Sequence, residues 1–94
     1  MGAYLIAHIT VKDPAEWQIY VDSVGETLRT YRAKVLFRGN HAQVLVGTHH
    51  HKAVAVLSFP DQATIRHWYD SQAYQSLVRT RNKAADVVFI SYRA

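Results

Sequence analysis

Three adjacent histidines stand in residues 47–52, with the sequence GTHHHK. Imidazole groups ligate metals and transfer protons near neutral pH. Side chains alternate in direction along extended backbone, so only His49 and His51 share a face. A tetrahedral zinc site requires a third protein ligand, and no other histidine or carboxylate has an obvious place in it. We therefore expect no metal site here and interpret the segment as an exposed polar turn, with a pocket lid or a pH-sensitive edge as alternatives.

Two arginines are candidates for ligand binding. Arg38 follows a β-rich run, and Arg81 interrupts an otherwise apolar helical face. A buried guanidinium is costly unless it has a partner. That partner is either a carboxylate of the chain, such as Asp86 or Asp70, or a bound anion. If it is an exchangeable ligand, the two arginines converge from opposite walls and form one site.

Hydroxyl and imidazole groups supply the remaining candidates. Tyr20 and Tyr74 occur on helix faces with apolar neighbours, which is also the pattern of core tyrosines with one hydroxyl partner. His8 lies in the middle of an extended run and is either a pocket base or a half-buried structural residue. Ser71 has the position of a helix N-cap and is included among the ligand-binding candidates. The catalytic residues are left open among Tyr20, Tyr74 and His8.

The composition excludes several kinds of chemistry. The chain has 94 residues and no cysteine, so disulfides and thiolate catalysis are excluded, and a reducing cytoplasm is the expected location. The formal charge of +4 is scattered along the sequence. No phosphate loop, dinucleotide fingerprint or calcium loop occurs, so we expect no cofactor. Nucleic-acid binding and membrane insertion are not expected, because the strand pattern of RNA-recognition motifs is absent and the N-terminal apolar run is short.

The elements that must position these groups follow from periodicity. Residues 4–11 alternate as a strand with one apolar face. Asp13, Pro14 and Glu16 form a capping-box pattern that begins a helix. The buried stripe of that helix is expected to contain Trp17, Tyr20, Val21, Val24, Leu28 and Tyr31.

The second half of the sequence also contains strand patterns and helix patterns. The runs AKVLFRG, AQVLVG and AVAVLSF predict strands, with GTHHHK as the hairpin between the last two. Asp61 begins a helix that buries Ile65, Trp68 and Tyr69, Ser71 begins another helical stretch, and residues 87–92 close the sheet. This order is typical of a single ferredoxin-like α+β domain over residues 1–94, an antiparallel sheet with helices on one face. The bare sheet face predicts a homodimer.

The sequence also resembles a known family. The segments AYLIAHITVKDPAEWQIYV, RGN, VLVG, LSFPD, WYDSQAYQSL and RNKAAD look like the domain-of-unknown-function family 1330 (DUF1330), in the dimeric α/β-barrel superfamily. The most specific element is YDSxxYQxL followed by Arg81. The resemblance implies a ferredoxin-like protomer that dimerises through its sheet and has a pocket between sheet and helices. Relatives in the superfamily include cofactor-independent monooxygenases, muconolactone isomerase-like proteins and haem-handling enzymes, so membership does not define a chemistry.

The family pattern is matched at many positions and missed at three. Matching residues are Tyr4, Asp13, Pro14, Tyr20, Arg38, Gly39, Gly47, Phe59, Ser71, Tyr74 and Arg81. Asn40 replaces a usual second glycine, and Val46 and Ser58 stand where glutamate is frequent. We therefore expect a pocket for a small anionic or carbonyl-bearing molecule. The protein is then either a cofactor-independent enzyme, with Arg38 and Arg81 holding the ligand, or a non-catalytic binding or interaction module.

Overall fold

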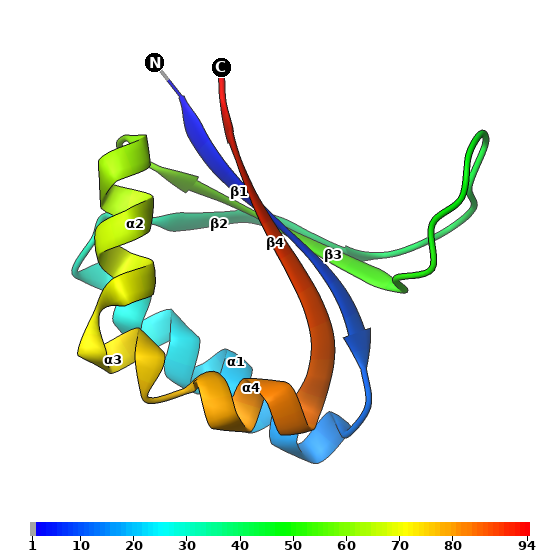
Figure 1. Cartoon of the computed structure of the whole chain (residues 1–94), viewed down its shortest axis with the longest axis horizontal. Coiled ribbons are helices and arrows are strands. Elements are labelled where there is room, and N and C mark those ends of the chain that lie inside the picture. Colours follow the sequence, from blue (N-terminus) through cyan, green and yellow to red (C-terminus); the bar gives the residue numbers. More distant parts are fainter. Residues whose placement is uncertain (1) are drawn as a thin grey trace.

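The computed structural model describes residues 2–94, which form one antiparallel sheet covered by helices on one face (Figure 1). The elements in chain order are β1 (Ala3–Val11), α1 (Pro14–Arg29), β2 (Lys34–Asn40), β3 (Ala53–Phe59), α2 (Gln62–Asp70), α3 (Gln72–Gln75), α4 (Val78–Ala84) and β4 (Ala85–Arg93). The strand order is β2-β3-β1-β4, with every neighbouring pair antiparallel. The expected ferredoxin-like α+β fold is confirmed. None of the helices in this part of the chain combines the length and apolar character that crossing a bilayer demands.

Strand β1 alternates as its sequence predicts. Leu5 and Ile9 point toward the helices and are buried, whereas Ile6 and His8 face the other side and are half-buried. Alanines on the helix side of β1 and β3 are also buried, and their small side chains let the helices approach the sheet closely. The core on this side contains Tyr20, Val24 and Leu28 of α1, Ile65 and Trp68 of α2, and Tyr74 of α3.

Helix α1 begins at the predicted residue, but its cap differs from a capping box. An Asp13 carboxylate oxygen accepts from the backbone N–H groups of Ala15 and Glu16, at 3.1 and 3.2 Å. The backbone N–H of Asp13 donates to the carbonyl of Ala84 at 3.0 Å. The Glu16 side chain is therefore not needed as its acceptor. The Asp13–Ala84 bond ties the start of α1 to the end of α4.

Ser71 separates α2 from α3. Its hydroxyl donates to the Trp68 carbonyl at 2.7 Å and accepts from the Tyr74 N–H at 3.1 Å. Ser71 thus closes one helix and begins the next, as the N-cap interpretation predicts. The change of direction at this residue brings the Tyr74 side chain into the core, where it is fully buried.

The connection between β2 and β3 differs from the prediction. The run AQVLVG forms no strand, and residues 42–50, called the arm below, extend away from the sheet (Figure 1). The arm turns at Gly47, whose φ of 87° lies in the left-handed region. Its base is closed by the bond from His41 N–H to the Lys52 carbonyl at 2.7 Å. Strand propensity in this run has no neighbouring strand to pair with, so it does not produce a strand.

The sheet face opposite the helices is apolar and uncovered; we call it the open face. The pairing register places Ile6, Val56 and Ile90 side by side on it. It also carries Tyr4, Phe37, Val54, Val88 and Tyr92, of which Phe37 and Tyr92 are 55% and 47% exposed. Strand β2 lies at the edge of the sheet, so Arg38 is at that edge and not in the middle of the sheet.

Candidate ligand-binding site

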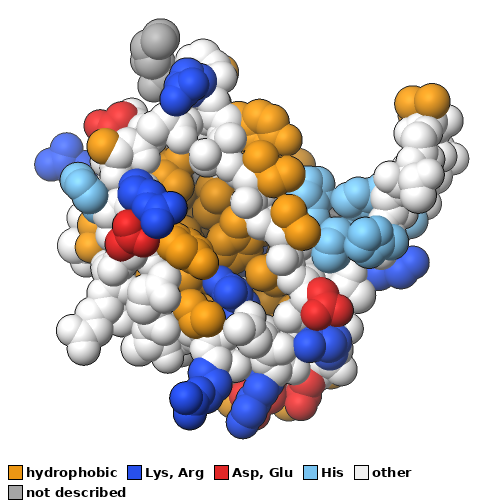
Figure 2. Space-filling view, in the orientation of Figure 1, with side chains coloured by type: hydrophobic (Ala, Val, Ile, Leu, Met, Phe, Trp, Pro, Cys, Tyr) orange, Lys and Arg blue, Asp and Glu red, His pale blue; other side chains and the backbone are white. Residues whose placement is uncertain are grey.

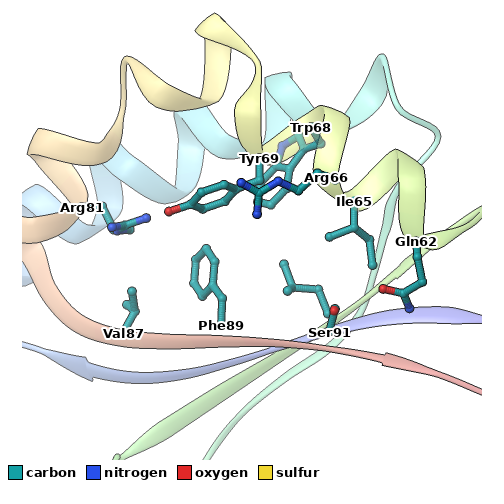
Figure 3. Close-up of a pocket in the computed structure, with 10 residues that line it drawn as sticks. Gln62, Ile65, Arg66, Trp68, Tyr69, Arg81, Val87, Phe89 and Ser91 are labelled. Atoms are coloured by element: carbon teal, nitrogen blue, oxygen red, sulfur yellow. The ribbon is translucent and has the colours of Figure 1, made fainter.

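A cavity of about 470 Å³ lies between helix α2 and strand β4 (Figure 3). Its helical wall carries Gln62, Arg66 and Tyr69, and its strand wall carries Phe89 and Ser91. The remaining lining residues are Leu5, Ile65, Trp68, Arg81 and Val87. Figure 2 shows a hollow lined with hydrophobic side chains on this face of the molecule. The cavity wall thus combines apolar and aromatic side chains with the polar side chains of Gln62, Arg66, Arg81 and Ser91.

Arg81 stands at one end of the cavity with only neutral partners. Its Nη1 donates to the Tyr74 hydroxyl at 3.1 Å, and its Nε and Nη2 donate to the Asn82 side-chain oxygen at 3.3 and 3.2 Å. In residues 2–94 no carboxylate lies within 4.0 Å of this guanidinium. The acidic partners suggested by the sequence are occupied elsewhere: Asp86 pairs with Lys12, and Asp70 pairs with Arg66.

Three residues of α2 complete the site. Figure 3 shows the Tyr69 hydroxyl pointing toward the Arg81 guanidinium across the cavity. Arg66 forms a 2.8 Å ion pair with Asp70 at the rim, so it has a carboxylate partner, which Arg81 lacks. The Gln62 amide donates to the Tyr92 carbonyl at 2.7 Å and closes the gap between α2 and β4. Sequence reasoning missed Gln62, Arg66 and Tyr69 as site residues and placed Tyr69 among the buried positions, although the helical spacing of the three residues puts them on one face.

Tyr20 and Tyr74 lie behind the cavity rather than on its wall. Their hydroxyl oxygens are 2.7 Å apart, and both side chains are buried. Burial raises the pKa of Tyr20, and the neighbouring Tyr74 raises it further. Burial also raises the pKa of Tyr74, against the opposing effects of hydrogen bonds from Tyr20 and Arg81. Both phenols therefore stay neutral near pH 7, and Tyr74 reaches the cavity only by holding Arg81.

Burial alone would lower the pKa of Arg81, because it removes water from the charged guanidinium. The hydrogen bond to Tyr74 and the nearby Tyr69 hydroxyl outweigh that effect and raise the pKa. Arg81 is therefore a permanent cation. The site combines this fixed positive charge, one hydroxyl and aromatic walls.

Other predicted site residues lie elsewhere. Arg38 is exposed on β2, at the opposite edge of the sheet from β4, and lines two other clefts beside Trp17 rather than the cavity that Arg81 borders. The structure therefore does not bring the two arginines together in the lining of one cavity. His8 faces the open side of the sheet and not the cavity. Ser71 is engaged in capping and does not line the cavity.

Comparison with known proteins identifies the family. The family described as "Domain of unknown function (DUF1330)" matches residues 2–92. The chain belongs to the DUF1330 family. No curated protein matches the sequence.

Solved structures show the same fold at low identity. This chain resembles RPA0582, a protein of unknown function from Rhodopseudomonas palustris. The TM-score is 0.84 and the sequence identity 16%, and the match covers 99% of this chain and 82% of RPA0582. SnoaB, a cofactor-independent oxygenase from Streptomyces nogalater, matches with a TM-score of 0.73, 10% identity, and coverage of 99% and 92%. A dimeric ferredoxin-like protein of unknown function from Thermobifida fusca matches with a TM-score of 0.65, 12% identity, and coverage of 100% and 92%.

The departures from the DUF1330 pattern lie away from the cavity. Asn40 ends β2, Val46 is on the arm, and Ser58 pairs with Tyr4 on the open face. None of the three lines the cavity. A carboxylate at these positions would therefore not act inside this cavity, and its absence leaves the charge of the site unchanged.

Four histidines of this DUF1330 chain, His8, His49, His50 and His51, lie close together in a cluster. His51 is 8% exposed, and its Nδ1 lies 2.9 Å from the Thr10 hydroxyl oxygen. The ring of His49 lies 5.0 Å from that of His8, and the ring of His50 lies 4.6 Å from that of His51. The expectation of a wholly exposed turn is wrong for His51, because the chain enters β3 there and packs against Thr10. Within residues 2–94 no three histidine or acidic side chains are placed to hold a metal ion.

Proposed function

We propose that this protein binds a small, mainly apolar molecule through an anionic or carbonyl oxygen in the cavity between α2 and β4. One observation carries the proposal: Arg81 borders a cavity with aromatic walls, is half-buried, and has no carboxylate partner within 4.0 Å. A cation that is partly removed from water attracts a negatively charged or strongly dipolar group. A ligand oxygen at this end of the cavity supplies that group.

The walls favour a planar ligand. The cavity volume of about 470 Å³ falls within the range of ordinary small-molecule sites. The ring of Phe89 lies below Arg81, with the guanidinium carbon 5.6 Å from the ring centroid. Tyr69 and Phe89 face each other across the cavity in Figure 3. An aromatic or conjugated ring that carries a carboxylate, ketone or enolate oxygen matches these groups.

The same arrangement supports a cofactor-independent enzyme. Arg81 can stabilise negative charge on a carbonyl oxygen as an enolate forms, and the Tyr69 hydroxyl points to the same place. SnoaB, which shares the fold, is described as a cofactor-independent oxygenase. The alternative is a binding module that performs no reaction. The candidates Tyr20 and Tyr74 then position the site without touching the ligand.

A paired measurement of binding and turnover tests the proposal. Benzoate, small keto acids, lactones and quinols are added to the wild type, to Arg81→Gln and to the control Arg38→Gln, and the melting temperature is recorded. We expect stabilisation of the wild type and of Arg38→Gln by carboxylate or carbonyl compounds, and its loss in Arg81→Gln. Product formation from a stabilising compound indicates an enzyme, and stabilisation without product indicates a binding module. No stabilisation by any compound contradicts the proposal.

We also propose a homodimer formed through the open face. Its support is the row of apolar side chains that no element of the described chain covers. Burying such a surface between two copies removes it from water. The Thermobifida fusca protein of the same fold is described as dimeric. We propose the cytoplasm as the location, because a chain without cysteine suits a reducing compartment.

A further inference from the structure

The arm, residues 42–50, exposes apolar side chains at its tip. Leu45 and Val46 are 87% and 91% exposed, and Val44 is 40% exposed. No Lys, Arg, Asp or Glu occurs between residues 41 and 51. Three consecutive apolar residues with high strand propensity and no nearby charge are an aggregation hazard when they stay in water. We call residues 44–46 the apolar tip.

Nothing on the described chain covers the apolar tip. The backbone bonds that hold the connection lie at its base, from His41 N–H to the Lys52 carbonyl and from Lys52 N–H to the Ile9 carbonyl, at 2.7 and 3.0 Å. The two limbs of the arm form no ladder with each other. Figure 2 shows the tip as hydrophobic atoms separated from the body of the molecule.

The arm leaves the protein on the side of the open face. Its returning limb packs there through His49, whose ring lies 5.0 Å from that of the open-face residue His8. Figure 1 shows the helices on one side of the sheet and the arm rising on the other. A molecule seated on the open face would therefore lie beside the arm.

We propose that the apolar tip clasps a second copy of this chain, the copy that packs on the open face. The inference rests on the proposed dimer and adds to it an interaction surface outside the sheet. A second copy fits better than a different protein, because the open face continues from Val54 and its neighbour His8 directly to the arm, where the ring of His49 lies 5.0 Å from that of His8. In a two-fold dimer each arm packs against the other protomer, so the apolar tips of both copies are buried.

Sedimentation equilibrium of matched variants tests the clasp. Leu45→Ser with Val46→Ser removes the apolar tip, and Gln43→Ser with Thr48→Ser changes the same arm but keeps the tip. We expect the dissociation constant of the dimer to rise about tenfold or more in the tip variant and to stay within about twofold in the control. The tip is exposed in a single copy, so the changes leave the fold of the protomer intact.

A fluorescence measurement provides an independent readout. The chain has no cysteine, so Gln43→Cys accepts an environment-sensitive dye at that position alone. We expect a blue shift of the dye as dilute protomers are concentrated into dimers. A wild type that is monomeric at all concentrations contradicts both the dimer and the clasp. A dimer whose affinity is unchanged in the tip variant, or a dye that does not shift on dimerisation, overturns the clasp and leaves the dimer standing.

Discussion

The Arg81 guanidinium donates to the hydroxyl of Tyr74 at 3.1 Å, at the point where the buried aromatic core meets the cavity. The Tyr74 hydroxyl is in turn 2.7 Å from that of Tyr20. A neutral oxygen therefore orients the cation but leaves its charge uncompensated. This arrangement is what makes the cavity a site for an anionic or carbonyl oxygen.

Replacing Tyr74 should destabilise the protein more than replacing Tyr20. Tyr74→Phe takes an acceptor from Arg81 and leaves the buried Tyr20 hydroxyl without its partner, which costs about 2–3 kcal/mol. Tyr20→Phe leaves the bond from Arg81 to Tyr74 in place and costs about 1 kcal/mol. Urea denaturation of both variants measures the difference. Equal losses would show that the bond to Arg81 contributes nothing to folding.

Ser71→Ala should reduce stability without changing ligand affinity. The hydroxyl accepts from the Tyr74 N–H and donates to the Trp68 carbonyl, so its removal costs about 1 kcal/mol. Denaturation and ligand titration of the same variant separate the two effects. A loss of ligand affinity at unchanged stability would make Ser71 part of the site.

The histidine cluster should make stability depend on pH. Desolvation lowers the pKa of His49, and so do the nearby His8, His51, His50 and His41. When the pKa of a histidine in the folded protein lies below the unfolded value of about 6.5, its contribution to the free energy of unfolding is fully present above pH 6.5. This contribution is lost as the pH falls through the folded pKa.

Melting temperatures at pH 7.5 and pH 5.0 measure this contribution. We expect the melting temperature of the wild type to fall further between pH 7.5 and pH 5.0 than that of His49→Gln. The control His67→Gln changes an exposed residue of α2 and should behave as the wild type does. An equal acid-induced loss in the wild type and His49→Gln contradicts the prediction.

A charge on the open face should dissociate the dimer. Ile90 pairs with Ile6 at the centre of that face, whereas Ile19 is 57% exposed on α1. Ile90→Asp should give a monomer at micromolar concentration, because a carboxylate opposed to an apolar surface loses its hydration. Ile19→Asp adds the same charge outside the interface and should remain dimeric. Sedimentation equilibrium that shows a dimer for Ile90→Asp argues against the open face as the interface.

The elements that the sequence predicts well are those with strong local signals. The alternation of Leu5, Ala7 and Ile9 defines the buried face of β1, and the Asp13-Pro14 pair begins α1 where the structure has it. Ser71 caps α3 as predicted. In each of these cases the deciding interaction is made within a few residues of the chain or follows directly from apolar periodicity.

The sequence fails where distant segments decide the outcome. Val44, Leu45 and Val46 have strand propensity, but the pairing of β2 directly with β3 leaves them outside the sheet. The cavity depends on Arg81 of α4 meeting Tyr69 of α2 above β4, and Arg38 lies outside its lining because β2 occupies the opposite edge of the sheet. The order of the strands in the sheet sets these distances, and no short segment of the sequence determines that order.

Calorimetric titration with a matched pair of ligands tests the central claim most directly. Benzoate and benzyl alcohol share a ring, but only benzoate carries an anionic oxygen for Arg81. We predict that benzoate binds the wild type at least about tenfold more tightly than benzyl alcohol does, and that Arg81→Gln removes this preference while Arg38→Gln preserves it. Equal affinity for the two ligands in the wild type, or a benzoate preference that persists in Arg81→Gln, would contradict an Arg81-centred binding site.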